Sequence, residues 1–213
     1  VVSYSFYNNY NSNDLNFGNI ILSLLIVVWA IRLGSFLFIR IKKAGEDIRF
    51  REIKKSPSRF FMTWTLQGMW VSICSACALS GIANGIEINS YFYLGLLIFT
   101  LGFITEIIAD NQKSKFRKDP NNKDKFITSG VWKYSRHPNY LGEITLWLGI
   151  SVISFSSLQG LELLTLVSPI FTYLLLVYVS GVRILEHNGN KKWGHLESYN
   201  DYKKNTPRLL GFL

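Results

Sequence analysis

Long apolar runs separated by polar segments are the feature that most constrains this chain. A helix needs about 20 mostly apolar residues to cross the hydrocarbon core of a bilayer. None of the runs alternates apolar and polar residues with period two, which argues against a membrane β-barrel. The sequence therefore predicts an all-α, polytopic membrane helix bundle with about five transmembrane helices. The five apolar runs cover residues 20–39, 60–80, 91–109, 140–156 and 161–184.

The composition supports a membrane protein over the other classes. Charged residues make up 17% of the 213 residues, whereas soluble proteins carry about 25%. The hydrophobic share of 48% excludes a disordered chain, and two cysteines do not suffice for a disulfide scaffold. The net charge of +9 comes in blocks between apolar runs, so we expect the lipid bilayer as a partner and no nucleic acid.

The positions of the 23 lysines and arginines predict the orientation. Eight lie in 40–59, eight in 111–136 and six from Arg183 onward, whereas residues 1–31 contain none. Cytoplasmic loops of membrane proteins are enriched in Lys and Arg. We therefore expect an outside N-terminus, with both basic loops and the C-terminus in the cytosol. The membrane is then either a bacterial inner membrane or the endoplasmic reticulum.

We interpret residues 1–213 as one transmembrane domain. The first apolar run has no basic segment before it and no small-residue cleavage site after it, so it is not a signal peptide. Because the chain begins at Val1 rather than at a methionine, further N-terminal helices would be compatible with this interpretation.

Polar residues inside the apolar runs are candidate functional residues, because an ionisable group at mid-helix costs about 2.5–3.5 kcal/mol on insertion scales. Arg32 either reaches the interface or contacts a substrate, and Gln67 either bonds another helix or contacts a substrate. Glu106 and Asp110 lie four residues apart on one helix face, where like charges repel. We expect a basic or hydroxyl-bearing partner beside them, or a solvated carboxylate at Asp110.

Metal and redox chemistry find little support in the sequence. Cys74 and Cys77 form a C-x-x-C inside an apolar run, where small packing residues are the expected interpretation. His137, His187 and His195 have no metal-ligand spacing, so we expect no metal. Neither G-x-G-x-x-G nor a Walker motif is present, so a nucleotide would not bind through a Rossmann fold.

The segment around Pro138 carries the strongest chemical signal. Pro138 suits the first position of a helix, and Arg136 and His137 precede it. A helix N-terminus presents free backbone N–H groups and a partial positive charge. We therefore predict an anion site of the kind that holds phosphates. A basic loop on anionic lipid is the alternative interpretation.

Two further polar residues follow on the same predicted helix. Asn139 and Glu143 are four residues apart and share one face, and Glu143 lies about 7–8 Å deeper than Pro138 at 1.5 Å rise per residue. This strip predicts a ligand with an anionic end and a polar head.

The segment Arg136-His-Pro-Asn-Tyr-Leu-Gly-Glu143 resembles the C-terminal signature of the steroid 5α-reductase-like integral membrane reductases. It is most similar to a bacterial-type branch catalogued as a domain of unknown function, and the resemblance extends from about Val28 to the C-terminus. Further matches follow in order: Trp29-x-x-Arg32-Leu33-Gly34, Gly45-Glu46-Asp47, Arg59-Phe60-Phe61, Gln67, Glu106-x-x-x-Asp110-x-Gln112, Ser180-Gly181, and Tyr199-x-x-Tyr202 with Thr206-Pro207.

This resemblance implies an NADPH-dependent oxidoreductase that reduces an activated C=C bond of a lipophilic substrate, either steroid-, isoprenoid- or enoyl-like. It places the dinucleotide between the cytosolic loops and the helix ends. Arg32 and Gln67 are the candidates for contact with the substrate. The candidate cofactor contacts are Asp110, Arg117, Arg136, His137, Asn139, Glu143, Arg183, Tyr199 and Tyr202.

No catalytic residue follows from the resemblance. The family's steroid reductases use a Gln–Glu pair on an early helix, and this chain has no such helix before residue 20. They also use a tyrosine near the position of Trp29, whose indole donates a hydrogen bond but is no acid. The proton donor is therefore unassigned.

Two other functions compete with the reductase. The S-adenosylmethionine-dependent isoprenylcysteine-type methyltransferases, a more distant resemblance, share the Arg-His-Pro-x-Tyr start, a Glu after the last span, here Glu186, and the Tyr-x-x-Tyr tail. Asn139, Glu143 and the Glu106/Asp110 pair favour the reductase. The third possibility is a non-enzymatic scaffold or carrier subunit. The polar groups gathered on the predicted cytosolic side argue against it.

Overall fold

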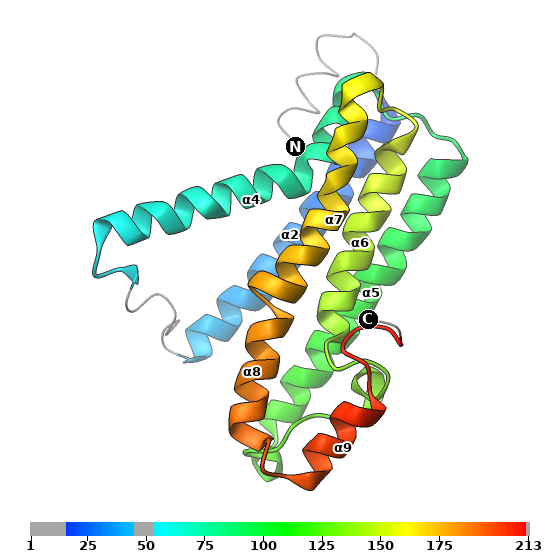
Figure 1. Ribbon diagram of the computed structural model, residues 1–213. Helices are drawn as coiled ribbons and strands as arrows, with labels where there is room; N and C mark the ends of the chain where they lie inside the picture. Colours follow the sequence, from blue (N-terminus) through cyan, green and yellow to red (C-terminus); the bar gives the residue numbers. More distant parts are fainter. Residues whose placement is uncertain (1–15, 45–52, 212–213) are drawn as a thin grey trace. The chain divides into compact units, whose positions relative to one another are not determined.

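The computed structural model describes residues 16–44 and 53–211 (Figure 1). Every regular element in these residues is helical, which confirms the predicted all-α class. The segment Gly45-Glu46-Asp47 of the predicted signature lies outside them. The elements in chain order are α2 (Phe17–Ala44), α4 (Pro57–Asn84), α5 (Ser90–Lys118), η1 (Pro120–Asn122), η2 (Gly130–Lys133), α6 (Pro138–Phe155), η3 (Gly160–Leu166), α7 (Val167–Leu174), η4 (Leu175–Val179), α8 (Val182–Trp193) and α9 (Glu197–Asn205).

Each predicted apolar run falls on helical structure, and the chain is an integral membrane protein. Four segments are long and apolar enough to cross a membrane: Phe17–Lys42, Pro57–Asn84, Ser90–Lys118 and Gly160–Trp193. The helix α6 has only 18 residues and is not among them. Its first two turns carry Asn139 and Glu143, which lower its apolar character. The described helices that meet this test thus number four instead of about five.

The helix α5 is longer than the hydrocarbon core of a membrane is thick. Its 29 residues extend about 43 Å at 1.5 Å rise per residue, whereas the hydrocarbon core is about 30 Å thick. The last turn carries Lys115, Arg117 and Lys118. The C-terminal turns of α5 therefore have room to project into the polar region with their basic side chains.

The chain divides into two compact units, and the single domain expected from the sequence stays a prediction. The first unit comprises Val1–Phe92 and Ile153–Ser168. Within it, the buried Asn19 amide donates to the Ile82 carbonyl over 3.1 Å, and its Oδ1 accepts from the Ile86 N–H over 2.9 Å. The Ser168 hydroxyl donates to the Cys74 carbonyl. Cys74 and Cys77 are buried, as expected for packing residues.

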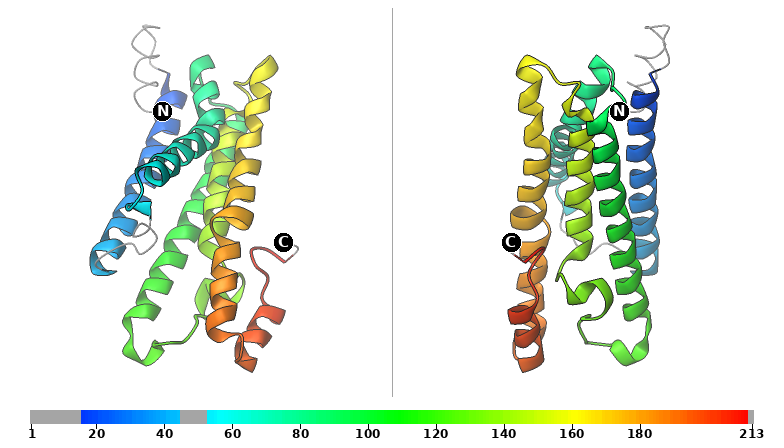
Figure 2. Two further views of the ribbon diagram at one scale, coloured as in Figure 1. Left: turned by 60° about the vertical axis from the view of Figure 1, so that its left-hand side comes forward. Right: turned by 90° about the vertical axis from the view of Figure 1, so that its right-hand side faces the viewer.

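The second unit comprises Tyr93–Val152 and Pro169–Leu213, and its α5 and α6 lie side by side (Figures 1 and 2). A Cβ atom placed on Gly142 would lie 2.6 Å from the Glu106 nitrogen, and one on Gly102 would lie 2.5 Å from the Leu146 nitrogen. Glycine is thus required where the two backbones meet, as in other close helix contacts in membranes. This contact places the end of α5 beside the start of α6.

The segment between α5 and α6 is hydrogen-bonded to α5. The buried Trp132 indole donates to the Ala109 carbonyl over 3.2 Å, and the Val131 N–H donates to Gln112 Oε1 over 3.0 Å. Gly130 has a φ of +65°, a conformation that favours glycine. The residues that precede α6 are thereby held against the last turns of α5.

Substituting Gly142 by alanine tests the α5–α6 contact. The added Cβ would force the helices apart, so we expect Gly142→Ala to lower the free energy of unfolding by about 1–3 kcal/mol. Gly34→Ala is the matched control, because nothing lies within 4 Å of a Cβ at this helical position. We expect this control to gain about 0.5–1 kcal/mol from alanine's helix preference. Thermal unfolding in detergent measures both, and equal effects would contradict the close contact.

Candidate functional site

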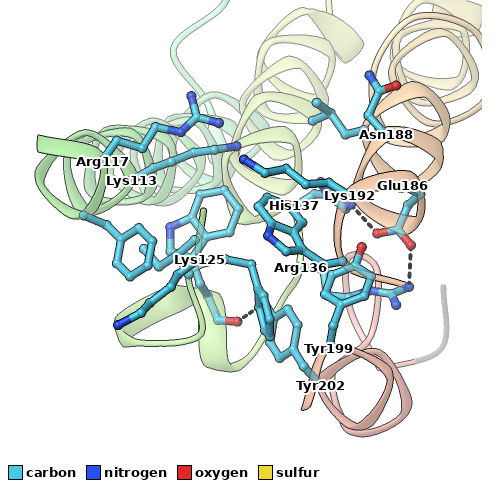
Figure 3. A pocket seen from close by; sticks show the side chains of 17 residues that line it. Lys113, Arg117, Lys125, Arg136, His137, Glu186, Asn188, Lys192, Tyr199 and Tyr202 are labelled. Carbon is cyan, nitrogen blue, oxygen red and sulfur yellow. Dashed lines mark hydrogen bonds and ion pairs between the residues drawn. The ribbon is translucent and has the colours of Figure 1, made fainter. Parts of the chain in front are cut away.

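The second unit contains a cavity of about 240 Å³ at the end where α5 stops and α6 begins. Its walls come from the C-terminal turns of α5, the segment before α6, and helices α8 and α9 (Figure 3). The lining residues are Lys113, Phe116, Arg117, Lys125, Phe126, Ile127, Trp132, Arg136, His137, Leu185, Glu186, Asn188, Gly189, Lys192, Trp193, Tyr199 and Tyr202.

Positive charge dominates the cavity. Among the described residues, five basic side chains line it, against the single carboxylate of Glu186. In Figure 3, Lys113 and Arg117 extend from α5, and Lys192 comes from the facing helix α8. Several cations that converge on one space favour a ligand with more than one negative group, such as a set of phosphates. The five are Lys113, Arg117, Lys125, Arg136 and Lys192.

Aromatic rings form much of the remaining wall. Phe126 lies at the centre of a cluster, with its ring centroid 5.0 Å from that of Tyr199, 5.8 Å from that of Tyr202 and 5.8 Å from that of Trp193. The Lys113 ammonium lies 4.7 Å from the centroid of the Trp132 ring. Aromatic faces of this kind offer stacking surfaces to planar ligand groups. The cavity thus combines anion-binding side chains with ring-binding ones.

Glu186 joins the two signature residues that precede α6. Its Oε1 lies 2.7 Å from His137 Nε2, and its Oε2 lies 3.5 Å from Arg136 Nη2. The His137 side chain is 8% exposed. Burial lowers the pKa of His137 below its usual value and outweighs the opposing effect of the nearby Glu186 carboxylate. We therefore describe His137 as neutral, with Nε2–H donating to Glu186.

The C-terminal tail holds the signature turn. The Arg136 N–H donates to the Pro207 carbonyl over 3.0 Å, and the His137 N–H donates to the Arg208 carbonyl over 3.1 Å. The tail's carbonyls thus accept from the backbone donors of these two residues, and the predicted anion site on the N–H groups at the start of α6 stays a prediction.

The α9 helix is tied to the same turn through a tyrosine. The Tyr202 hydroxyl donates to the Trp132 carbonyl over 2.5 Å. Burial raises the pKa of Tyr202 to about 12 and also raises that of Tyr199. Both phenols thus stay protonated at neutral pH.

Five of the nine predicted cofactor residues line the cavity, namely Arg117, Arg136, His137, Tyr199 and Tyr202. The other four do not. Asp110 is buried on α5, Asn139 and Glu143 are partly buried on α6, and Arg183 is exposed on α8. Their assignment as cofactor contacts stays a prediction.

The two predicted substrate residues belong to the first unit and do not line the cavity. The Arg32 guanidinium lies 5.5 Å from the centroid of the Phe36 ring on α2. Gln67 is exposed on α4. Their role in substrate contact also stays a prediction.

Several lining residues escaped the sequence analysis. Lys113 lies one helical turn before Arg117 and on the same face of α5, a spacing that could have identified it. Lys125 and Phe126 lie in an irregular segment, and no periodic pattern marks them. Lys192 is in the last turn of α8. Glu186 was considered only for the methyltransferase alternative. Within the described residues, no three His, Cys, Asp or Glu side chains group together as metal ligands.

Comparison with known proteins identifies a family and several relatives. The family model described as "Protein of unknown function (DUF1295)" matches residues 1–206. The probable O-methyltransferase ustE of Ustilaginoidea virens is 32% identical over 101 residues, 46% of this chain and 35% of that protein. The 3-oxo-5-alpha-steroid 4-dehydrogenase 1 of Mus musculus is 30% identical over 122 residues, 57% of this chain and 42% of that protein. The Delta(14)-sterol reductase of Arabidopsis thaliana is 28% identical over 42% of this chain and 25% of that protein.

These matches confirm the predicted resemblance to steroid 5α-reductase-like membrane proteins. The matched segments cover 35% and 42% of the lengths of the first two curated relatives, so the chain spans less than half of each. No solved structure matches the chain.

Removing the Tyr202 hydroxyl tests the link between α9 and the signature turn. Tyr202→Phe leaves the Trp132 carbonyl without its donor, so we expect the free energy of unfolding to fall by about 1–3 kcal/mol. Tyr134 is 74% exposed, and Tyr134→Phe is a control that should stay within about 0.5 kcal/mol of the wild type. Thermal unfolding of both variants makes the comparison. A Tyr202→Phe variant as stable as this control would show that the hydrogen bond does not hold the turn.

Proposed function

The chain belongs to the DUF1295 family, and we propose that it is a membrane reductase that uses NADPH to reduce an activated C=C bond of a lipophilic substrate. One observation carries this proposal: five basic side chains and a cluster of aromatic rings line one cavity beside the Arg136–Glu143 signature. The phosphates and planar rings of a dinucleotide are the complementary chemistry. When bound, NADPH would supply the hydride for the reduction.

The residues of the cavity fit part of such a cofactor. Ligand pockets usually measure about 300–1,000 Å³, and this cavity of about 240 Å³ has room for a phosphate-bearing portion rather than the whole dinucleotide. Asp110 lies three residues before Lys113 on α5, and Asn139 and Glu143 follow His137 on α6. We propose that the remaining portion extends along these two helices.

Each group of side chains has a distinct task in this proposal. Arg117 and Arg136 present planar guanidinium groups that suit phosphate oxygens, and Lys113 and Lys192 add point charges. Trp193 and its neighbouring rings would stack on a planar group of the cofactor. The side chains thus bind and orient the dinucleotide and exclude water from it.

The substrate side of the proposal rests on the membrane setting and on the relatives. Four of the described segments are long and apolar enough to cross a bilayer, so a lipophilic substrate can enter laterally from lipid. Two relatives carry names that refer to a steroid and a sterol. We propose Arg32 and Gln67 as substrate contacts. The basic loops face the cytosol in this proposal, where NADPH is available.

An S-adenosylmethionine-dependent methyltransferase is the second candidate, because one relative is named a probable O-methyltransferase. The positive charge of the cavity argues against a methyltransferase. S-adenosylmethionine carries a sulfonium and an ammonium group, and the lining offers five cations against one carboxylate. That carboxylate, Glu186, already contacts His137 and Arg136. The cavity thus favours an anionic ligand over a cationic one.

Titration calorimetry on detergent-purified protein tests the proposal with NADPH, NADH and S-adenosylmethionine in parallel. We expect binding of NADPH that weakens as salt is added, because screening reduces the attraction between phosphates and cations. Arg117→Gln should weaken binding about tenfold or more, since a hydrogen bond to a charged group contributes about 1.5–3 kcal/mol. Lys115→Gln is the matched control, because Lys115 is exposed on the same helix and does not line the cavity.

Two results would contradict the proposal. The first is the absence of heat with NADPH together with saturable binding of S-adenosylmethionine, which would favour the methyltransferase. The second is equal weakening by Arg117→Gln and Lys115→Gln, which would place the dinucleotide outside the cavity.

A further inference from the structure

One ring nitrogen of His137 has no hydrogen-bond partner among the residues that the structure describes. Nε2 contacts Glu186 Oε1 at 2.7 Å, whereas Nδ1 is buried and accepts no hydrogen bond from residues 16–44 or 53–211. The residue lines the cavity, and its side chain is more than nine-tenths buried. An unpaired buried polar atom is unfavourable, and native proteins have few of them. The cavity that His137 lines is the place from which a ligand could supply the missing partner.

The contact with Glu186 decides what kind of partner this must be. A carboxylate only accepts hydrogen bonds, so Nε2 carries the hydrogen of the neutral ring. Nδ1 is then a bare acceptor, and its partner must be a donor. Figure 3 shows His137 and Arg136 meeting Glu186 from α8 on one side of the cavity, with Lys113 and Arg117 on α5. The cavity therefore offers an acceptor next to several cations.

We propose that Glu186 is a positioning residue that fixes His137 so that Nδ1 accepts a hydrogen bond from an N–H or O–H group of the bound nucleotide. This inference rests on the proposed function, because it takes NADPH as the ligand. Dinucleotides carry such donors on the ribose hydroxyls, the carboxamide and the adenine amine, beside the phosphates that the cations attract. Glu186 does not itself touch the ligand. It acts through the orientation and the tautomer of the imidazole, as carboxylates do for other functional histidines.

Two substitutions of His137 distinguish the roles of its two ring nitrogens. His137→Gln reaches toward the place of Nε2 and can still donate to Glu186, but it has no acceptor at Nδ1. His137→Asn places its shorter carboxamide near Nδ1 and supplies an acceptor oxygen there, but it does not reach Glu186. We expect NADPH to bind about fivefold to tenfold more weakly to His137→Gln. His137→Asn should restore most of that loss.

A third variant tests whether Glu186 positions His137. The test is whether NADPH affinity rises or falls. Glu186→Gln removes the one carboxylate among the lining residues, so charge alone predicts tighter binding of the anionic NADPH. In our proposal the neutral amide no longer fixes the Nε2–H tautomer, because it can either accept from or donate to Nε2. We therefore expect weaker binding, by about threefold or more. Thermal unfolding of each variant, compared with wild type, identifies any loss of folded protein.

The titrations use NADPH and the full chain in detergent. Each outcome either supports or overturns the inference. Unchanged affinity in His137→Gln, equal losses in the Gln and Asn variants, or tighter binding by Glu186→Gln would each overturn this inference and leave the proposed function intact. Failure of the wild type to bind NADPH would overturn both. Weak binding by His137→Gln and Glu186→Gln with recovery in His137→Asn would support the inference.

Discussion

The close contact between α5 and α6 is the constraint on which the cavity depends. Gly102 and Gly142 leave no room for a side chain, so the two backbones meet directly. That contact determines which turns of α5 stand beside the residues that precede α6. Arg117 and Lys113 on one helix can then share a cavity with Arg136 and His137 before the other. A wider separation would divide the positive charge between two distant surfaces.

The concentration of positive charge is costly unless nearby groups offset it. Glu186 neutralises part of the charge near Arg136, and Lys192 pairs with the exposed Asp124 over 2.8 Å. The tail's carbonyls occupy the backbone donors of Arg136 and His137. Basic side chains and aromatic rings line the same cavity. This combination suits a phosphate-bearing ligand that brings its own planar groups.

The fold was largely predictable, because helices that face lipid must be apolar over their whole length. The runs from residue 20 to 109 identified α2, α4 and α5 directly. The fourth run marked α6, although Asn139 and Glu143 make it too polar to count among the segments that clearly span a membrane. The signature identified Arg136 and His137 because their chemistry is local to one turn.

The rest of the site depends on tertiary contacts that no local pattern encodes. Phe126 enters the aromatic cluster from an irregular segment, and Lys192 reaches the cavity from a helix about 55 residues after Arg136. The tail's contact with the Arg136 N–H joins residues far apart in the sequence. Arg32 and Gln67 were candidates because they are polar residues inside apolar runs, and polarity does not say which cavity a residue lines.

The central claim is that NADPH occupies the cavity at the end of α5 and α6, and lysine footprinting with NADPH tests it most directly. An amine-specific reagent is applied to the purified protein with and without NADPH, and the extent of modification at each lysine is measured by mass spectrometry. The account predicts slower modification at Lys113, Lys125 and Lys192, which line the cavity, and unchanged modification at Lys115 and Lys118, which do not. Unchanged modification at all three cavity lysines under saturating NADPH would contradict it.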